Sequence, residues 1–89
     1  MLDIRQKAAA GTMESSDAYV EIEPAEEGLE IRVESVVQQQ FGAVIETAAQ
    51  EVLQQYGVQK AAVRIFDRGA LDCVIRARVE TAILRGKGE

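Results

Sequence analysis

The chain has 89 residues, of which 47% are hydrophobic and 28% are charged, and its formal net charge is −5. This length fits one small globular domain and leaves no room for separate catalytic and binding domains. The sequence has no His and one Cys, which argues against an imidazole general base, a Cys-rich zinc site and an internal disulfide, although Asp and Glu chemistry stays possible. We therefore expect no catalytic residue and no metal site in this chain.

Acidic and basic residues are unevenly distributed. Residues 1–35 hold nine acids and three bases, whereas residues 60–89 hold four acids and seven bases. The negative overall charge argues against nucleic-acid binding, which needs a positive field opposite the phosphates. The asymmetry fits docking to another protein, or ordinary surface charge that maintains solubility.

The sequence does not predict membrane association. Its longest uninterrupted apolar runs have only a few residues, far short of the roughly 20 that span a bilayer. The N-terminal residues lack the apolar stretch of a signal peptide. An unpaired Cys fits a reducing compartment, so the expected location is the cytoplasm.

The first half of the chain predicts two strands after an arm. Residues 1–18 show no sustained period and are expected to form a flexible, irregular arm. Residues 19–23 and 29–34 alternate apolar and polar side chains, which predicts two half-buried strands. Residues 24–28 have Pro at the start and Gly at the end, so we expect a turn that joins these strands in an antiparallel hairpin.

A long helix is predicted next, over residues 36–56. Ser35 and Gln38 have the spacing of a capping box at its start, and Gly57 stands where a left-handed residue ends a helix. Its apolar residues recur at steps of three and four and form one stripe. The stripe contains Val37, Phe41, Val44, Ile45, Ala48, Val52, Leu53 and Tyr56.

The last part predicts a strand over residues 60–66, a turn at 67–69 and a helix over 70–85. Asp67 could cap the segment after the turn, and residues 86–89 are expected to fray. The inward residues of the helix are expected to be Leu71, Ile75, Val79, Ala82 and Ile83.

These elements predict a single α+β domain over residues 1–89. The order β-β-α-β-α after the arm gives a two-layer sandwich, with a three-stranded sheet and two helices on one face. Because a helix connects the second strand to the third, those two strands should be parallel. The pattern leaves the order of the strands open.

Three groups of side chains are weak candidates for chemistry. Cys73 lies beside core residues of the second helix, where a lone Cys usually serves packing. The acidic group shares the outer face of the first two strands and consists of Glu21, Glu23, Glu30 and Glu34. The basic group consists of Arg64, Arg68, Arg76 and Arg78. A solvated face explains the acids, and separate surface positions explain the arginines, since residues two apart on a helix do not share a face.

The segment Glu14-Ser15-Ser16-Asp17 is the remaining candidate. One interpretation is a turn or cap, because Ser and Asp side chains bond the local backbone. The other is a modification site, in which a serine hydroxyl is presented to a separate transferase. The residues themselves do not distinguish Ser15 from Ser16.

Four stretches resemble the acyl carrier proteins of citrate lyase, the γ subunits of that enzyme. They are Gly11-Thr12-Met13-Glu14-Ser15-Ser16-Asp17, Gln40-Phe41-Gly42, Val52-Leu53-Gln54-Gln55-Tyr56 and Asp67-Arg68-Gly69-Ala70-Leu71-Asp72-Cys73-Val74-Ile75-Arg76-Ala77-Arg78. The resemblance follows the same order over nearly the whole chain. In this family the first serine of the Glu-Ser-(Ser or Gly)-Asp segment carries a prosthetic group, and that serine is Ser15 here.

The resemblance implies a covalent phosphoribosyl dephospho-CoA cofactor, attached to Ser15 by a prosthetic-group transferase. It implies that the thiol of this group holds acetyl and citryl thioesters while citrate is cleaved to acetate and oxaloacetate. The implied partners are the citrate lyase α subunit (acyl transferase) and β subunit (citryl lyase), and the carrier itself is not catalytic. Two alternatives stay open, the acyl carrier of malonate decarboxylase and a protein-interaction domain without a catalytic role.

Overall fold

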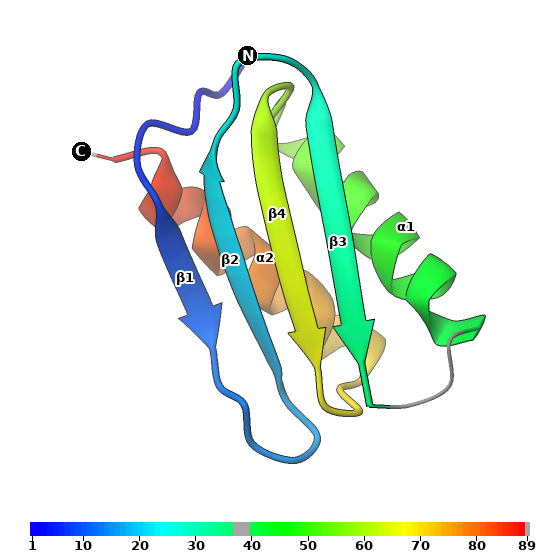
Figure 1. Ribbon diagram of the computed structural model, residues 1–89. Coiled ribbons are helices and arrows are strands. Elements are labelled where there is room, and N and C mark those ends of the chain that lie inside the picture. The colour runs from blue at the N-terminus through cyan, green and yellow to red at the C-terminus, as the bar shows by residue number, and fades with distance from the viewer. Residues whose placement is uncertain (37–39, 89) are drawn as a thin grey trace.

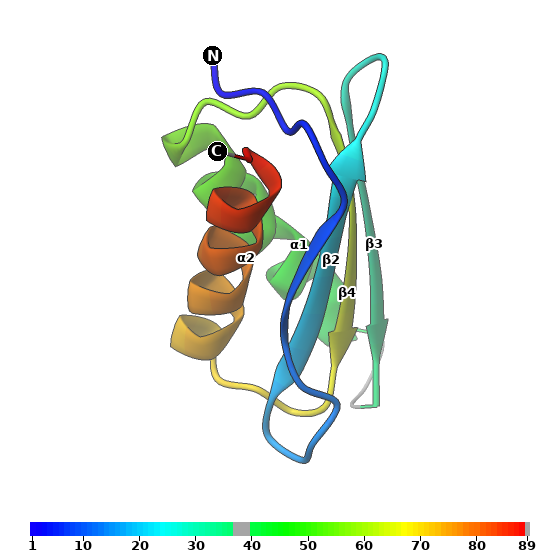
Figure 2. The ribbon, with the colours of Figure 1, turned by 90° about the vertical axis from the view of Figure 1, so that its left-hand side faces the viewer.

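The computed structural model describes residues 1–36 and 40–88, without the side chains of residues 40 and 41. The elements in chain order are β1 (Ala8–Gly11), β2 (Ala18–Pro24), β3 (Leu29–Ser35), α1 (Gln40–Gln55), β4 (Ala61–Asp67) and α2 (Asp72–Gly86). The strands form one layer, and both helices cover the same face of it (Figures 1 and 2). The predicted two-layer α+β architecture is confirmed, but the described residues form four strands where three were predicted.

The order of the strands across the sheet is β1-β2-β4-β3. β3 and β4 are parallel, so the crossover through α1 is confirmed. The antiparallel hairpin predicted for residues 19–23 and 29–34 is wrong, because β4 lies between β2 and β3 and pairs with both (Figure 1). Alternating side chains show which face of a strand is buried, but they do not identify the neighbouring strand.

The N-terminal segment is more regular than predicted. Residues 8–11 form the edge strand β1, which pairs antiparallel with β2 and places Ala10 in the core. Ile4 is also buried, and the backbone N–H of Leu2 donates to the carbonyl oxygen of Gly57 at 2.9 Å. The prediction of an irregular arm is therefore wrong for this part, because a run of alanines has neither alternation nor high β-propensity.

The described parts of both helices begin later than the predicted starts at residues 36 and 70. The predicted cap Ser35 is instead the last residue of β3, and Gln38 lies outside the described residues. Gly57 has a φ of 71°, which confirms the left-handed residue predicted after the first helix. At the C-terminus, the predicted fraying of residues 86–89 is wrong for Gly86, which is the buried last residue of α2 and accepts bonds from the N–H groups of Arg5 and Gln6. Glu89 lies outside the described residues.

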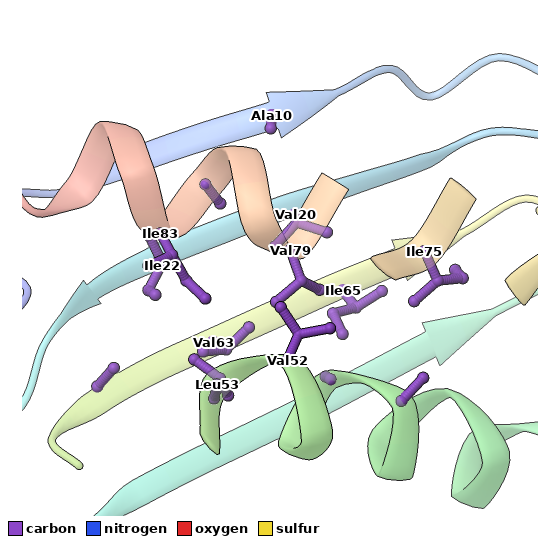
Figure 3. Packing of buried hydrophobic residues seen from close by; sticks show 14 of the residues in the cluster. Ala10, Val20, Ile22, Val52, Leu53, Val63, Ile65, Ile75, Val79 and Ile83 are labelled. Atoms are coloured by element: carbon purple, nitrogen blue, oxygen red, sulfur yellow. The ribbon is translucent and has the colours of Figure 1, made fainter. Parts of the chain in front are cut away.

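A continuous apolar core fills the space between the two layers (Figure 3). Its largest fully buried side chains are Ile22, Leu53, Ile65, Ile75, Ile83, Val20, Val63 and Val79. The predicted inward positions are mostly confirmed, but Val44 and Leu71 are exposed, at 58% and 71%. Val37 and the side chain of Phe41 lie outside the described part of the chain. Within the described residues, no helix has the length and apolar character needed to cross a membrane.

Candidate functional site

The β1–β2 loop, residues 12–17, lies at one end of the sandwich (Figures 1 and 2). Its Ser15 is exposed. Gly11 enters the loop with a φ of 98°, and a Cβ at this position would lie 1.9 Å from the carbonyl oxygen of Ala18. Only glycine fits such a close approach of two chain segments. Ser16 has a φ of 66°, which makes it the one described non-glycine residue with a positive φ. The backbone therefore turns sharply directly after Ser15.

Asp17 holds this loop together through both of its carboxylate oxygens. The hydroxyl of Thr12 donates to Oδ2 at 2.6 Å, and the backbone N–H of Ala18 donates to Oδ1 at 2.7 Å. Arg78 of α2 donates from Nε to Oδ1 at 3.0 Å and from Nη2 to Oδ2 at 2.9 Å. Such a two-pronged contact fixes the orientation of both side chains. The loop is thereby joined to a helix residue that lies 61 positions further along the sequence.

A second connection runs through the backbone of Arg68, in the turn between β4 and α2. The N–H of Ser16 donates to the carbonyl oxygen of Arg68 at 2.8 Å, and the N–H of Arg68 donates to the carbonyl oxygen of Asp17 at 2.9 Å. The first bond holds the N–H of Ser16 and the second holds the carbonyl group of Asp17. The backbone next to Ser15 is consequently fixed by the β4–α2 turn as well as by α2.

The turn itself is stabilised by the buried carboxylate of Asp67, which is 2% exposed. The N–H of Ala70 donates to its Oδ1 at 2.9 Å, a bond within the turn. The N-cap of α2 is Leu71 and has no side-chain capping bond, so the predicted capping of the helix by Asp67 is wrong. The hydroxyl of Ser35 donates to Oδ2 of Asp67 at 2.8 Å. The end of β3, the end of β4 and the start of the connection to α2 therefore share one carboxylate.

The electrostatics of the loop suit presentation of a hydroxyl rather than catalysis by the loop. The guanidinium of Arg78, the hydroxyl of Thr12 and the N–H of Ala18 hold the pKa of Asp17 well below its usual value. An ionised carboxylate with four donors around it is a poor proton acceptor. Among the described residues, no side chain hydrogen-bonds the Ser15 hydroxyl. Ser15 is thus available to a group from outside the chain.

The structure does not gather the other candidates into a site. Cys73 is exposed, so the prediction that it packs in the core is wrong. It lies in the first turn of α2, and the buried residues of this helix begin at Ile75. The four predicted outer-face glutamates do lie on the uncovered face of the sheet, where Arg64 reaches Glu21 at 3.9 Å.

Arg76 and Arg78 contact different parts of the molecule, as their spacing indicated. Arg76 contacts Glu51 at 2.6 Å and Asp72 at 2.7 Å, on the outer side of the helices. Arg78 instead contacts the loop. Sequence reasoning missed this role of Arg78, and no local pattern indicates it, because its partner lies at the other end of the chain.

Comparison with known proteins identifies relatives over nearly the full length. Residues 5–86 match a family model described as the malonate decarboxylase delta subunit, an acyl carrier protein. The chain is 49% identical over 85 residues to the citrate lyase acyl carrier protein of Klebsiella pneumoniae, covering 94% of this chain and 88% of that protein. It is 50% identical over 88 residues to the protein of the same name in Rhodopseudomonas palustris, covering 99% and 91%.

A solved structure also has this fold. It is the crystal structure of a Pseudomonas malonate decarboxylase hetero-tetramer in complex with malonate, one chain of which matches with a TM-score of 0.71. The sequence identity is 26%, and the match covers 93% of this chain and 86% of that chain.

Proposed function

Because the chain belongs to the family of citrate lyase acyl carrier proteins, we propose that it is the acyl carrier of a citrate lyase and bears phosphoribosyl dephospho-CoA on Ser15. Carriers of this family are non-catalytic subunits of a multi-subunit lyase. The observation that carries the proposal is the exposed Ser15 on a loop whose ends are fixed, in a chain that lacks His. Such a loop can present a hydroxyl, and the carboxylate of Asp17 beside it is already engaged by four donors.

The residues around Ser15 fit the attachment of a large group. The hydroxyl is exposed and has no hydrogen-bond partner among the described residues. The neighbouring Ser16 adopts a positive φ, which glycine adopts without strain. This conformation accounts for the choice of Ser or Gly at that position in the family that the sequence resembles. When bound, the group would supply the thiol that carries acyl groups as thioesters.

The chain would contribute position rather than chemistry to citrate cleavage. A compact body with a tethered group raises the local concentration of the acyl group at each partner's site, which makes successive transfers effectively intramolecular. The proposed partners are the α and β subunits of citrate lyase and, before assembly, the prosthetic-group transferase. The proposed compartment is the cytoplasm, whose reducing conditions suit the free Cys73.

Co-expression with a citrate lyase transferase and its precursor-forming enzyme tests the proposal. We expect the intact mass to increase by one prosthetic group, and peptide mapping to place it on Ser15. Ser15→Ala should abolish the increase, whereas Ser16→Gly should keep it and serves as the matched control because glycine tolerates the backbone there. A wild-type chain that stays unmodified, while a known citrate lyase carrier is modified in parallel, would refute the proposal.

The malonate decarboxylase carrier is a second candidate, favoured by the family model and by the solved hetero-tetramer. The two functions differ in the catalytic partners that accept the modified carrier. We expect the modified chain to support citrate cleavage by separately prepared citrate lyase α and β subunits, and to support no malonate decarboxylation. The reverse result would assign the chain to malonate decarboxylase. A chain that is never modified and binds neither enzyme would instead be an interaction domain.

A further inference from the structure

We propose that Asp17 and Arg78 form a positioning pair, which holds the β1–β2 loop in the shape that the transferase needs to modify Ser15. The proposal rests on the proposed carrier function and adds a role for two residues outside the attachment point. Both residues act through the loop backbone and neither is a catalytic residue.

The first support is the geometry of the pair. Arg78 reaches across the edge of the sheet from α2, and both of its donors meet both oxygens of Asp17. The carboxylate is 15% exposed and the guanidinium side chain is 37% exposed, so the pair is partly shielded from solvent. The path of Arg78 also passes close to Gly11, since a Cβ there would lie 3.1 Å from its Cδ. One side chain thus bonds the end of the loop and passes close to the last residue of β1, which precedes the loop.

The second support is that the pair fixes the loop while the Ser15 side chain stays exposed. Asp17 lies two residues after Ser15, and Asp17 bonds back to Thr12 at the opposite end of the loop. The N–H of Asp17 also donates to the carbonyl oxygen of Glu14 at 3.1 Å. These contacts fix the residues around Ser15, while the Ser15 side chain stays exposed. The loop is rigid where it meets the domain and open at the reacting hydroxyl.

The transfer step itself shows why position is the contribution required. Oγ of Ser15 attacks the phosphorus of a triphosphate precursor, a phosphodiester bond forms and pyrophosphate leaves. The Oγ proton goes to a base of the transferase, because Asp17 is already occupied by four donors. A displacement of about 1 Å in the reacting group can reduce such a rate by about 100-fold. A loop fixed before the encounter also loses less conformational freedom on binding.

Three variants test the pair. Asp17→Asn keeps the shape of the side chain and removes its charge. Arg78→Gln removes both the charge and the pair of guanidinium donors, whereas Arg78→Lys keeps the charge but not the paired donors. The matched control is Arg76→Gln, which removes an ion-paired arginine of the same helix that contacts Asp72 and Glu51 and lies away from the loop. Unfolding temperatures identify a working temperature at which every variant is folded.

The assay measures the initial rate of modification at several carrier concentrations, by intact mass. We expect Asp17→Asn and Arg78→Gln to lower kcat/KM about 10-fold to 100-fold, and Arg78→Lys to lie between them and the wild type. Arg76→Gln should stay within about twofold of the wild type, as expected for an exposed ion pair. Amide hydrogen exchange in residues 12–17 should accelerate in the first two variants and stay unchanged in the control, a local readout that general destabilisation does not produce.

Two outcomes overturn the proposal. One is folded Asp17→Asn and Arg78→Gln variants that are modified at the rate of the wild type. The other is a loss of rate in Asp17→Asn without faster exchange in the loop, since Asp17 would then contact the transferase directly. If wild-type Ser15 is never modified, the proposed function fails, and the exchange experiment still tests whether the pair fixes the loop.

Discussion

Replacing Gly11 by alanine should destabilise the domain far more than the same change at Gly28. Both glycines have a positive φ, 98° and 65°, so both alanines carry backbone strain of about 1–2 kcal/mol. At Gly28 no atom lies within 4 Å of the added Cβ. At Gly11 the Cβ would lie 1.9 Å from the carbonyl oxygen of Ala18, a backbone atom that must move.

Relief of this overlap requires the β1–β2 loop to open at its base. The bond between Thr12 and Asp17 and at least one strand-end bond are then lost, at about 1 kcal/mol each. The Gly11 variant should therefore be less stable than the Gly28 variant by about 2 kcal/mol, or by roughly 10 °C in Tm for a domain of this size.

Thermal and urea unfolding, followed by circular dichroism, measure this difference. The Gly28 variant supplies the strain term alone, so the comparison isolates the overlap with Ala18. Equal stability of the two variants would refute the steric argument. If the Gly11→Ala variant loses stability while amide hydrogen exchange in residues 12–17 stays unchanged, the strain is absorbed outside the loop.

Three further predictions concern charge, packing and exposure. The contacts of Asp17 lower its pKa from 3.8, so its charge stabilises the fold fully above that value and less as the pH falls below it. The Asp17→Asn variant should therefore be less stable than the wild type at neutral pH, and the two stabilities should converge in acid. Urea titrations at each pH measure this difference. Leu53→Ala should lower the free energy of unfolding by about 2–5 kcal/mol. Leu84→Ala, at a 43% exposed position, should change it by less than about 0.5 kcal/mol. Similar losses of stability in the two variants would contradict the assigned core. Cys73 is exposed and should react with a maleimide in the native protein nearly as fast as in urea, and strong native protection would contradict its position.

The sequence predicted local structure well because local structure has local causes. Alternation identified β2, β3 and β4 and their buried faces, and Gly57 marked a helix end through its backbone freedom. The neighbours in the sheet could not be predicted, since the central position of β4 depends on hydrogen bonds to strands distant in the sequence. The strand β1 was not predicted because Ala8–Gly11 carries no periodic pattern.

The candidate site divides in the same way. Ser15 was indicated by a short motif and by its resemblance to a family, and both act over a few adjacent residues. Arg78 was assigned to a surface group, because its contact with Asp17 exists only after α2 packs beside β1. Leu71 was predicted to face inward because the predicted helix starts at residue 70, whereas α2 begins at Asp72 and Leu71 is its exposed N-cap. Cys73 is exposed because the buried positions of α2 begin only at Ile75.

The distance along the chain between the β1–β2 loop and its contacts has a consequence for the timing of modification. Ser15 leaves the ribosome before its contacts do, since Arg68 and Arg78 follow it by 53 and 63 residues in the sequence. Until α2 has emerged and docked, the loop lacks the contacts that give it its shape. A transferase that recognises this shape would modify molecules in which α2 is docked, and would not modify nascent chains that still lack α2. The fold would in this way couple loading of the carrier to the docking of α2.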